Sequence, residues 1–124
     1  MNVLVVDDVK DIQPLFEQRF RREIRSGEVK LTFAFSAEQA LEKLKEYEQE
    51  AVLILSDINM PGMSGLDLLE KIKAMYHEPP PVVMMITAYG DDENFNTAKR
   101  LGADAFLTKP LDFANLKSKL KNMM

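Results

Sequence analysis

Short apolar runs alternate five times with longer segments in which apolar residues recur at helical spacing. Three of these runs are apolar throughout: NVLVV at residues 2–6, AVLIL at 51–55 and PVVMMI at 81–86. A strand that helices cover on both faces is expected to be apolar at every position. These three runs therefore predict the central strands of a parallel sheet.

Two further runs predict strands nearer the edges of that sheet. KLTFAF at residues 30–35 alternates, with Leu31, Phe33 and Phe35 on one face, and DAFLT at 104–108 is short. The segments between the strands carry apolar stripes at Ile12, Leu15, Phe16 and Phe20; Ala37, Leu41 and Leu44; Leu66, Leu69 and Ile72; Phe95, Ala98 and Leu101; and Phe113, Leu116, Leu120 and Met123. This (βα)5 pattern predicts an α/β fold, a doubly wound parallel five-stranded sheet with right-handed crossovers and helices on both faces.

Local signals mark where several helices begin. Ser36 with Gln39 forms a predicted capping box, and Ser64 with Asp67 predicts a similar acidic helix N-terminus. The stretch FRREIRSGEVK, residues 20–30, is long for a turn into the second strand. We therefore expect the first helix to extend into it.

Composition limits the class of protein. A chain of 124 residues with 46% hydrophobic and 29% charged residues has the size of one globular domain, so we expect residues 1–124 to form a single unit. It has no apolar run long enough to cross a bilayer and no leader-like N-terminus, which favours a cytoplasmic location without membrane association. With no cysteine and one histidine, any metal must be held by oxygen ligands.

The charge balance argues against a nucleic-acid surface. The net charge is -4, and the lysines and arginines are interleaved with acids. Binding to a phosphate backbone needs a basic stripe. Basic clusters such as RFRREIR and KSKLKN are therefore interpreted as solvated helix faces, and no direct nucleic-acid binding is expected.

Polar side chains stand at the carboxyl ends of four predicted strands. Asp7 and Asp8 follow the first strand, Asp57 the third and Thr87 the fourth, while Lys109 and a proline follow the fifth. Each has an ordinary alternative, because an acid after a strand often caps the next helix and a Lys-Pro pair is often only a loop. In open α/β sheets, however, ligands bind at this edge, where the strand order reverses. The five residues together therefore predict a site.

The chemistry of such a site follows from its charges. Three carboxylates brought together repel one another and raise each other's pKa unless a cation lies among them. Mg2+ fits, because it takes a few carboxylate or carbonyl oxygens and keeps positions for water and phosphate oxygens. An ionised aspartate beside Mg2+ can attack a phosphoryl group while the metal and an ammonium neutralise the transferring oxygens. The predicted product is an aspartyl phosphate.

With these motifs in place, the chain resembles a response-regulator receiver domain (CheY-like) of two-component signalling. The resemblance runs from residue 2 to the last helix through VLVVDD, LILSDINMPGMSG, MMITAYG and GADAFLTKPL, in that order. It implies the flavodoxin-like strand order 2-1-3-4-5. It also implies a phosphorylation-activated switch that catalyses its own phosphorylation and dephosphorylation but turns over no metabolite.

The resemblance assigns roles to the residues of the site. It implies that Asp57 accepts phosphate from a histidine kinase or phosphotransfer protein. Asp8 would ligate Mg2+ directly, Asp7 would do so largely through water, and the backbone carbonyl of Asn59 would complete the metal site. Lys109 would pair with the phosphate.

The resemblance also implies a conformational response. Thr87 would hydrogen-bond the phosphate on activation, Phe106 would be the switch aromatic that turns inward, and Pro110 would follow a cis peptide bond. Phe106 has a plainer alternative as a core residue of an edge strand, and it lacks a tyrosine hydroxyl. Val9 departs from the family pattern in which a third acid frequently follows the acidic pair.

The output face implied by the resemblance consists of the fourth helix, the fifth strand and the last helix. This face would control an output domain or effector protein, or form a homodimer. Ala88, Tyr89 and Phe106 could repack there, and charges of both signs are offered by Lys99, Arg100, Asp104, Lys117 and Lys119. These charges alternatively form only a solvated rim.

Three other functions are compatible with parts of this pattern. A haloacid-dehalogenase-like phosphatase needs a second aspartate two residues after the nucleophile, where Asn59 stands. A flavin-binding carrier of the same strand order needs a hydroxyl- and glycine-rich phosphate loop after the first strand, where Asp7 and Asp8 would repel the flavin phosphate. A phosphorylation-independent pseudo-receiver, acting as an interaction module, stays open as the alternative.

Overall fold

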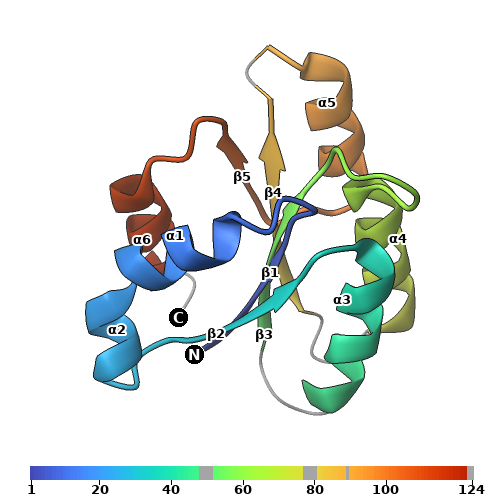
Figure 1. Ribbon diagram of the computed structural model, residues 1–124. Coiled ribbons are helices and arrows are strands. Elements are labelled where there is room, and N and C mark those ends of the chain that lie inside the picture. The colour runs from blue at the N-terminus through green and yellow to red at the C-terminus, as the bar shows by residue number, and fades with distance from the viewer. Residues whose placement is uncertain (48–51, 77–80, 89, 123–124) are drawn as a thin grey trace.

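The five strands form one parallel sheet in the order β2-β1-β3-β4-β5 (Figure 1). The computed structural model describes residues 1–47, 52–76, 81–88 and 90–122. The strands are β1 (Asn2–Val6), β2 (Lys30–Ala34), β3 (Val52–Asp57), β4 (Val82–Thr87) and β5 (Ala105–Thr108). The predicted fold class and strand order are confirmed. Ala51, which the sequence assigned to the third strand, lies outside the described residues.

Helices cover both faces of the sheet. They are α1 (Ile12–Arg19), α2 (Arg21–Arg25), α3 (Ala37–Leu44), the 3-10 turn η1 (Lys45–Tyr47), α4 (Gly65–Met75), α5 (Asp92–Arg100) and α6 (Phe113–Asn122). In Figure 1, α1 and α6 lie on one side of the sheet, and α3, α4 and α5 lie on the other. Within the described ranges, none of the helices combines the length and apolarity that crossing a bilayer requires.

The sheet divides the hydrophobic core into two clusters. Successive residues of a strand point to opposite faces, so Val3 and Val5 pack with the side chains of α1 and α6, while Leu4 and Val6 pack with those of α3, α4 and α5. All six residues of β3 are buried, whereas β2 and β5 each contain exposed positions at the sheet edges. The predicted division into central and edge strands is therefore confirmed.

The first helical region differs from the prediction of one extended helix. α1 ends at Arg19, the backbone of Phe20 leaves helical geometry at φ -102° and ψ 18°, and α2 begins at Arg21. The rings of Phe16 and Phe20 stack with their centroids 5.9 Å apart, and both are buried. Phe20 therefore stays in the core one helical turn after Phe16, although the regular helix ends just before it. Leu15, predicted to belong to the buried stripe, is 38% exposed.

The predicted helix caps are present. At α4, the hydroxyl of Ser64 accepts from the N–H of Asp67, and the Asp67 carboxylate accepts from the N–H of Ser64. At α3, Ser36 accepts from the N–H of Gln39, but the Gln39 side chain accepts from the N–H of Phe35, one residue before the cap. Both arrangements satisfy N–H groups that the first turn of a helix leaves without partners.

Candidate functional site

Three aspartates meet at the carboxyl edge of the sheet, between β1 and β3. Asp7 and Asp8 directly follow β1, and Asp57 is the last residue of β3. A carboxylate oxygen from each lies within 4.8 Å of the other two. Asp7 and Asp57 are buried, at 4% and 3% exposure, while Asp8 is half-buried. Strand order reverses between β1 and β3, so the cluster occupies the position that the fold favours for a ligand.

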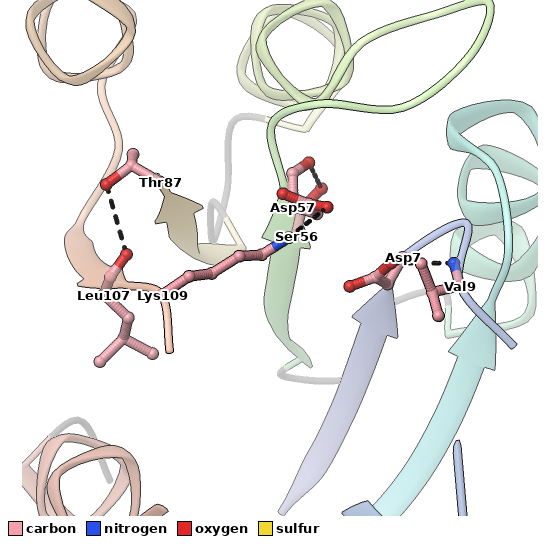
Figure 2. Close-up of polar contacts among 7 residues, drawn as sticks. All are labelled: Asp7, Val9, Ser56, Asp57, Thr87, Leu107 and Lys109. Carbon is pink, nitrogen blue, oxygen red and sulfur yellow. Dashed lines mark hydrogen bonds and ion pairs between the residues drawn. The ribbon is translucent and has the colours of Figure 1, made fainter. Parts of the chain in front are cut away.

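Lys109 reaches the same cluster from the other side of β4. It follows the last residue of β5, and its side chain extends toward β3 (Figure 2). The Lys109 Nζ lies 3.0 Å from Oδ2 of Asp57, and the side chains are 46% and 5% exposed, respectively. The peptide bond between Lys109 and Pro110 is cis, the isomer that the resemblance implies. The ammonium group of Lys109 therefore faces the most buried carboxylate of the cluster, while the rest of the Lys109 side chain is partly exposed to solvent.

The environment shifts two pKa values in this cluster. Burial raises the pKa of Asp7, and the nearby charges of Asp57 and Asp8 add to this effect. The Val9 N–H, which donates to Asp7 Oδ1 at 2.9 Å, and the charge of Lys109 oppose it. Burial alone would lower the pKa of Lys109, but its hydrogen bond to Asp57 and its attraction to the three carboxylates raise that pKa instead. Lys109 is consequently a cation throughout the neutral range.

Thr87 lies at the end of β4, but its hydroxyl is engaged elsewhere. The Oγ1 of Thr87 donates to the carbonyl oxygen of Leu107 at 3.4 Å, on the β5 side (Figure 2). The hydroxyl of Ser56, which is fully buried, donates to the carbonyl oxygen of Asp57 at 3.0 Å. The structure therefore fixes the backbone of Asp57 and leaves the Thr87 hydroxyl bonded away from the acidic cluster.

Phe106 is half-buried on β5 and contacts α5. Its ring centroid lies 4.4 Å from that of Phe95, with 44° between the ring planes. Phe95 is 37% exposed, so the sequence was wrong to group it with the buried stripe of its helix. No local pattern predicts this pairing, because the two residues belong to different elements. Asn59, whose carbonyl was predicted to face a metal, lies in the loop after β3 with an exposed side chain.

Two of the charges predicted to face a partner already have intramolecular partners. Asp104 Oδ2 lies 3.0 Å from Lys73 Nζ of α4, and it accepts the N–H of Val83 at 2.8 Å. Lys117 of α6 lies 2.9 Å from a carboxylate oxygen of Glu23 on α2. The other predicted residues of this face include Tyr89, which lies outside the described residues, and Lys99 and Arg100, which are exposed.

The donor set suits a small divalent cation. The three carboxylates offer oxygen ligands within 4.8 Å of one another, and two of them are buried. Mg2+ prefers such oxygen ligands and needs only a few from the protein. Ionised carboxylates this close repel one another unless a cation compensates them, and Lys109 supplies only one positive charge. The cluster is therefore suitable for a metal ion.

A parallel α/β sheet with an acidic cluster at its switch point matches a known class of signalling domain. The family model for the response regulator receiver domain matches residues 3–121, and the chain belongs to this family.

Individual relatives agree with this assignment. Transcriptional regulatory protein ZraR of Escherichia coli is 36% identical over 124 residues, which make up 100% of this chain and 26% of that protein. Response regulator RppA of Synechocystis sp. is 31% identical over 121 residues, 98% of this chain and 49% of that protein. The chain thus spans less than half the length of either relative. The solved receiver domain of NtrX from Brucella abortus superposes with a TM-score of 0.80 at 31% identity, covering 97% of this chain and 95% of that one.

Proposed function

We propose that Asp57 accepts a phosphoryl group from the phosphohistidine of a histidine kinase or phosphotransfer protein, and that the aspartyl phosphate switches the domain. The contact between Asp57 and Lys109 carries this proposal. Asp57 is a buried carboxylate at the end of a central strand, and the ammonium 3.0 Å away can neutralise incoming phosphoryl oxygens. Membership of the receiver family supports the same reaction.

In the proposed transfer, a carboxylate oxygen of Asp57 attacks phosphorus. The new P–O bond forms as the P–N bond to the donor histidine breaks, and the imidazole leaves with the electron pair and takes up a proton. Lys109 attracts the oxygens of the transferring group and holds them beside the nucleophile. Asp57 thereby becomes an acyl phosphate, and its later hydrolysis returns the carboxylate.

We assign the metal ligands to Asp7, Asp8, Asp57 and the backbone carbonyl of Asn59. Bound Mg2+ would supply positive charge to the phosphoryl oxygens. Asp7 is positioned for this task by the N–H of Val9, which holds one of its oxygens at 2.9 Å. That contact uses a backbone group, so it does not depend on the type of side chain at position 9.

The proposed switch moves Thr87 from Leu107 toward the phosphate. The Thr87 hydroxyl now donates to the Leu107 carbonyl at 3.4 Å, a long hydrogen bond that a charged phosphate oxygen would readily replace. Phe106 directly precedes Leu107 and contacts Phe95. Movement of Thr87 would free space beside β5 and allow the Phe106 ring to turn inward. The proposal thus links the site to α5, β5 and α6.

We propose that the face formed by α5, β5 and α6 is the output surface, binding an output domain, an effector or a second copy. Lys99 and Arg100 are exposed at the end of α5 and offer positive charge to an acidic partner. The relative ZraR is longer than this chain and is named a transcriptional regulatory protein, which supports an attached or separate output partner.

Mass spectrometry tests the phosphorylation site. Incubation with a small acyl phosphate and Mg2+ should add one phosphoryl group that base and hydroxylamine remove. Asp57→Asn should abolish this addition, whereas Asp92→Asn, which changes an exposed aspartate at the start of α5, should preserve it. An unmodified native chain, with both a small donor and a phosphorylated kinase, would instead favour the interaction module without phosphorylation.

Amide NMR tests the output surface. Beryllofluoride with Mg2+ mimics the phosphoryl group on Asp57, and it should shift amides of α5, β5 and α6 as well as those of the site. Shifts confined to the neighbourhood of Asp57 would contradict the proposed output surface while leaving phosphorylation intact.

A further inference from the structure

Gly65 lies against the backbone of Asp57, although it is not one of the polar residues of the site. It is the first residue of α4 and is buried, and its N–H donates to the carbonyl oxygen of Ile58 at 2.8 Å. A Cβ at this position would lie 2.9 Å from the carbonyl carbon of Asp57, 2.8 Å from the Cα of Ile58, and still closer to the carbonyl oxygen of Asp57. The helix therefore begins at a distance from Asp57 that only glycine permits.

The requirement at Gly65 is for space and not for an unusual backbone conformation. The described glycines with positive φ are Gly27, Gly62, Gly90 and Gly102, and Gly65 is not among them. Gly62, in the same loop, is the opposite case. Its φ is 74°, and a Cβ there would come no closer than 3.7 Å to the side chain of Glu38. The two glycines of the loop thus meet separate physical demands.

Neither the start of α4 nor the end of β3 can move easily to make room for a Cβ at position 65. The start of α4 is fixed by the reciprocal cap between Ser64 and Asp67, and its buried face, which includes Leu68, packs into the core. On the other side, Asp57 ends a fully buried central strand, and the N–H of Ile58 donates to β4 at the carbonyl of Ile86, 3.3 Å away. An added methyl group would therefore strain the peptide between Asp57 and Ile58 as well as the helix.

We propose that Gly65 is a positioning residue for phosphoryl transfer. By letting α4 begin directly against the Asp57 peptide, it keeps the carboxylate directed at the acidic cluster and at Lys109. This inference rests on the proposed function of Asp57. Displacing a nucleophile by a fraction of an ångström to about 1 Å lowers reaction rates by up to about a hundredfold. The expected defect lies in the transfer step and not in donor capture.

The test compares Gly65→Ala with the matched variant Gly62→Ala. Each adds one methyl group to the segment that leads from β3 into α4, but only the methyl group at position 65 meets the Asp57 backbone. Phosphorylation is followed by intact mass over a range of small acyl phosphate concentrations at saturating Mg2+. Gly65→Ala should lower the limiting rate at least about tenfold with a similar half-saturating donor concentration, whereas Gly62→Ala should stay within about twofold of the native rate.

A second measurement separates positioning from folding. The folded fraction of each variant is determined by circular dichroism, and the assay is repeated in a stabilising osmolyte such as trimethylamine oxide, which favours the compact state. A positioning defect should persist when the folded fraction is restored. Recovery of the native rate in osmolyte, or a limiting rate within about twofold of native for folded Gly65→Ala, would overturn the inference. A native chain that takes up no phosphate would instead contradict the proposed function.

Removal of the helix cap should change stability and phosphorylation rate in opposite directions. Adding Ser64→Ala to Gly65→Ala removes the cap that fixes the helix start, so the first turn can move away from Asp57. The double variant should be less stable than Gly65→Ala but phosphorylate faster. A further decrease in rate, parallel to the loss of stability, would contradict the positioning role.

Discussion

The ammonium of Lys109 and the carboxylate of Asp57 lie 3.0 Å apart, although 52 positions separate the two residues in the chain. Asp57 is nearly inaccessible at its side chain, whereas Lys109 remains about half exposed at 46%. Solvent therefore weakens the contribution of this pair to stability. Its value lies in placing a positive charge where transferred phosphoryl oxygens would arrive.

Lys109→Ala should abolish most phosphorylation without abolishing metal binding. The variant retains all three carboxylates of the cluster but loses the cation that faces the phosphoryl oxygens, so we expect a rate about a hundredfold or more below native. Intact mass gives the rate, and a Mg2+ titration followed by amide shifts gives the metal affinity. If Lys109→Ala lost Mg2+ binding as well as phosphorylation, Lys109 would instead be needed for the structure of the metal site.

Mg2+ should stabilise the native chain and have little effect on Asp8→Ala. A ligand that binds only the folded state at a hundred times its Kd adds about 2.7 kcal/mol to the free energy of unfolding. Removing one of the three clustered carboxylates should weaken Mg2+ affinity and reduce this gain. Thermal melts of each protein with Mg2+ and with EDTA measure this gain in stability. Equal Mg2+ effects on both proteins would place the metal elsewhere.

Asp7→Asn should stabilise the metal-free protein at neutral pH. The pKa of Asp7 is raised above its ordinary value of 3.8, mainly by burial, so the folded state binds this proton more tightly than the unfolded chain does. The contribution of Asp7 to stability is therefore greatest below its unfolded pKa and falls as pH rises through the folded pKa.

Urea unfolding of both proteins in EDTA between about pH 3 and pH 7 tests this sign. The difference in unfolding free energy, Asp7→Asn minus native, should increase with pH. Because asparagine keeps an oxygen for the Val9 N–H, the change isolates the charge. With saturating Mg2+, the native protein should instead have the larger free energy of unfolding. A difference between the two proteins that does not vary with pH would contradict the raised pKa of Asp7.

The contact between Phe95 and Phe106 should be measurable as a coupling that phosphorylation changes. Aromatic pairs in contact contribute about 0.5–1.5 kcal/mol beyond burial. A double-mutant cycle with Phe95→Leu and Phe106→Leu should give a coupling energy in this range without phosphate. If Phe106 turns inward on activation, the coupling should fall when beryllofluoride and Mg2+ are present. An unchanged coupling would contradict the proposed movement of the ring.

The sequence by itself determined the class of fold and most of the polar site. Continuous apolar runs that alternate with segments of helical spacing, as at residues 2–6, are typical of strands covered by helices on both faces, so local composition predicts the central strands. Once the strands are parallel, their carboxyl ends share one edge. The convergence of Asp7, Asp57 and Lys109 then follows from where those residues stand in the chain.

Only the tertiary structure decided contacts that depend on distance between elements. The break at Phe20 is one example, because the four-residue spacing of Phe16 and Phe20 would suit a continuous helix equally well and therefore does not predict where α1 ends. The pairing of Phe106 with Phe95, and of Asp104 with Lys73, likewise joins elements whose separation is set by the whole packed sheet.

Gly65 shows the same division most clearly. Its sequence position after a serine cap predicts a helix start, and the structure agrees. The reason for glycine there is the backbone of Asp57, close enough that no Cβ fits between strand and helix. Local sequence encodes which element forms, whereas the space left between packed elements is a property of the assembled core.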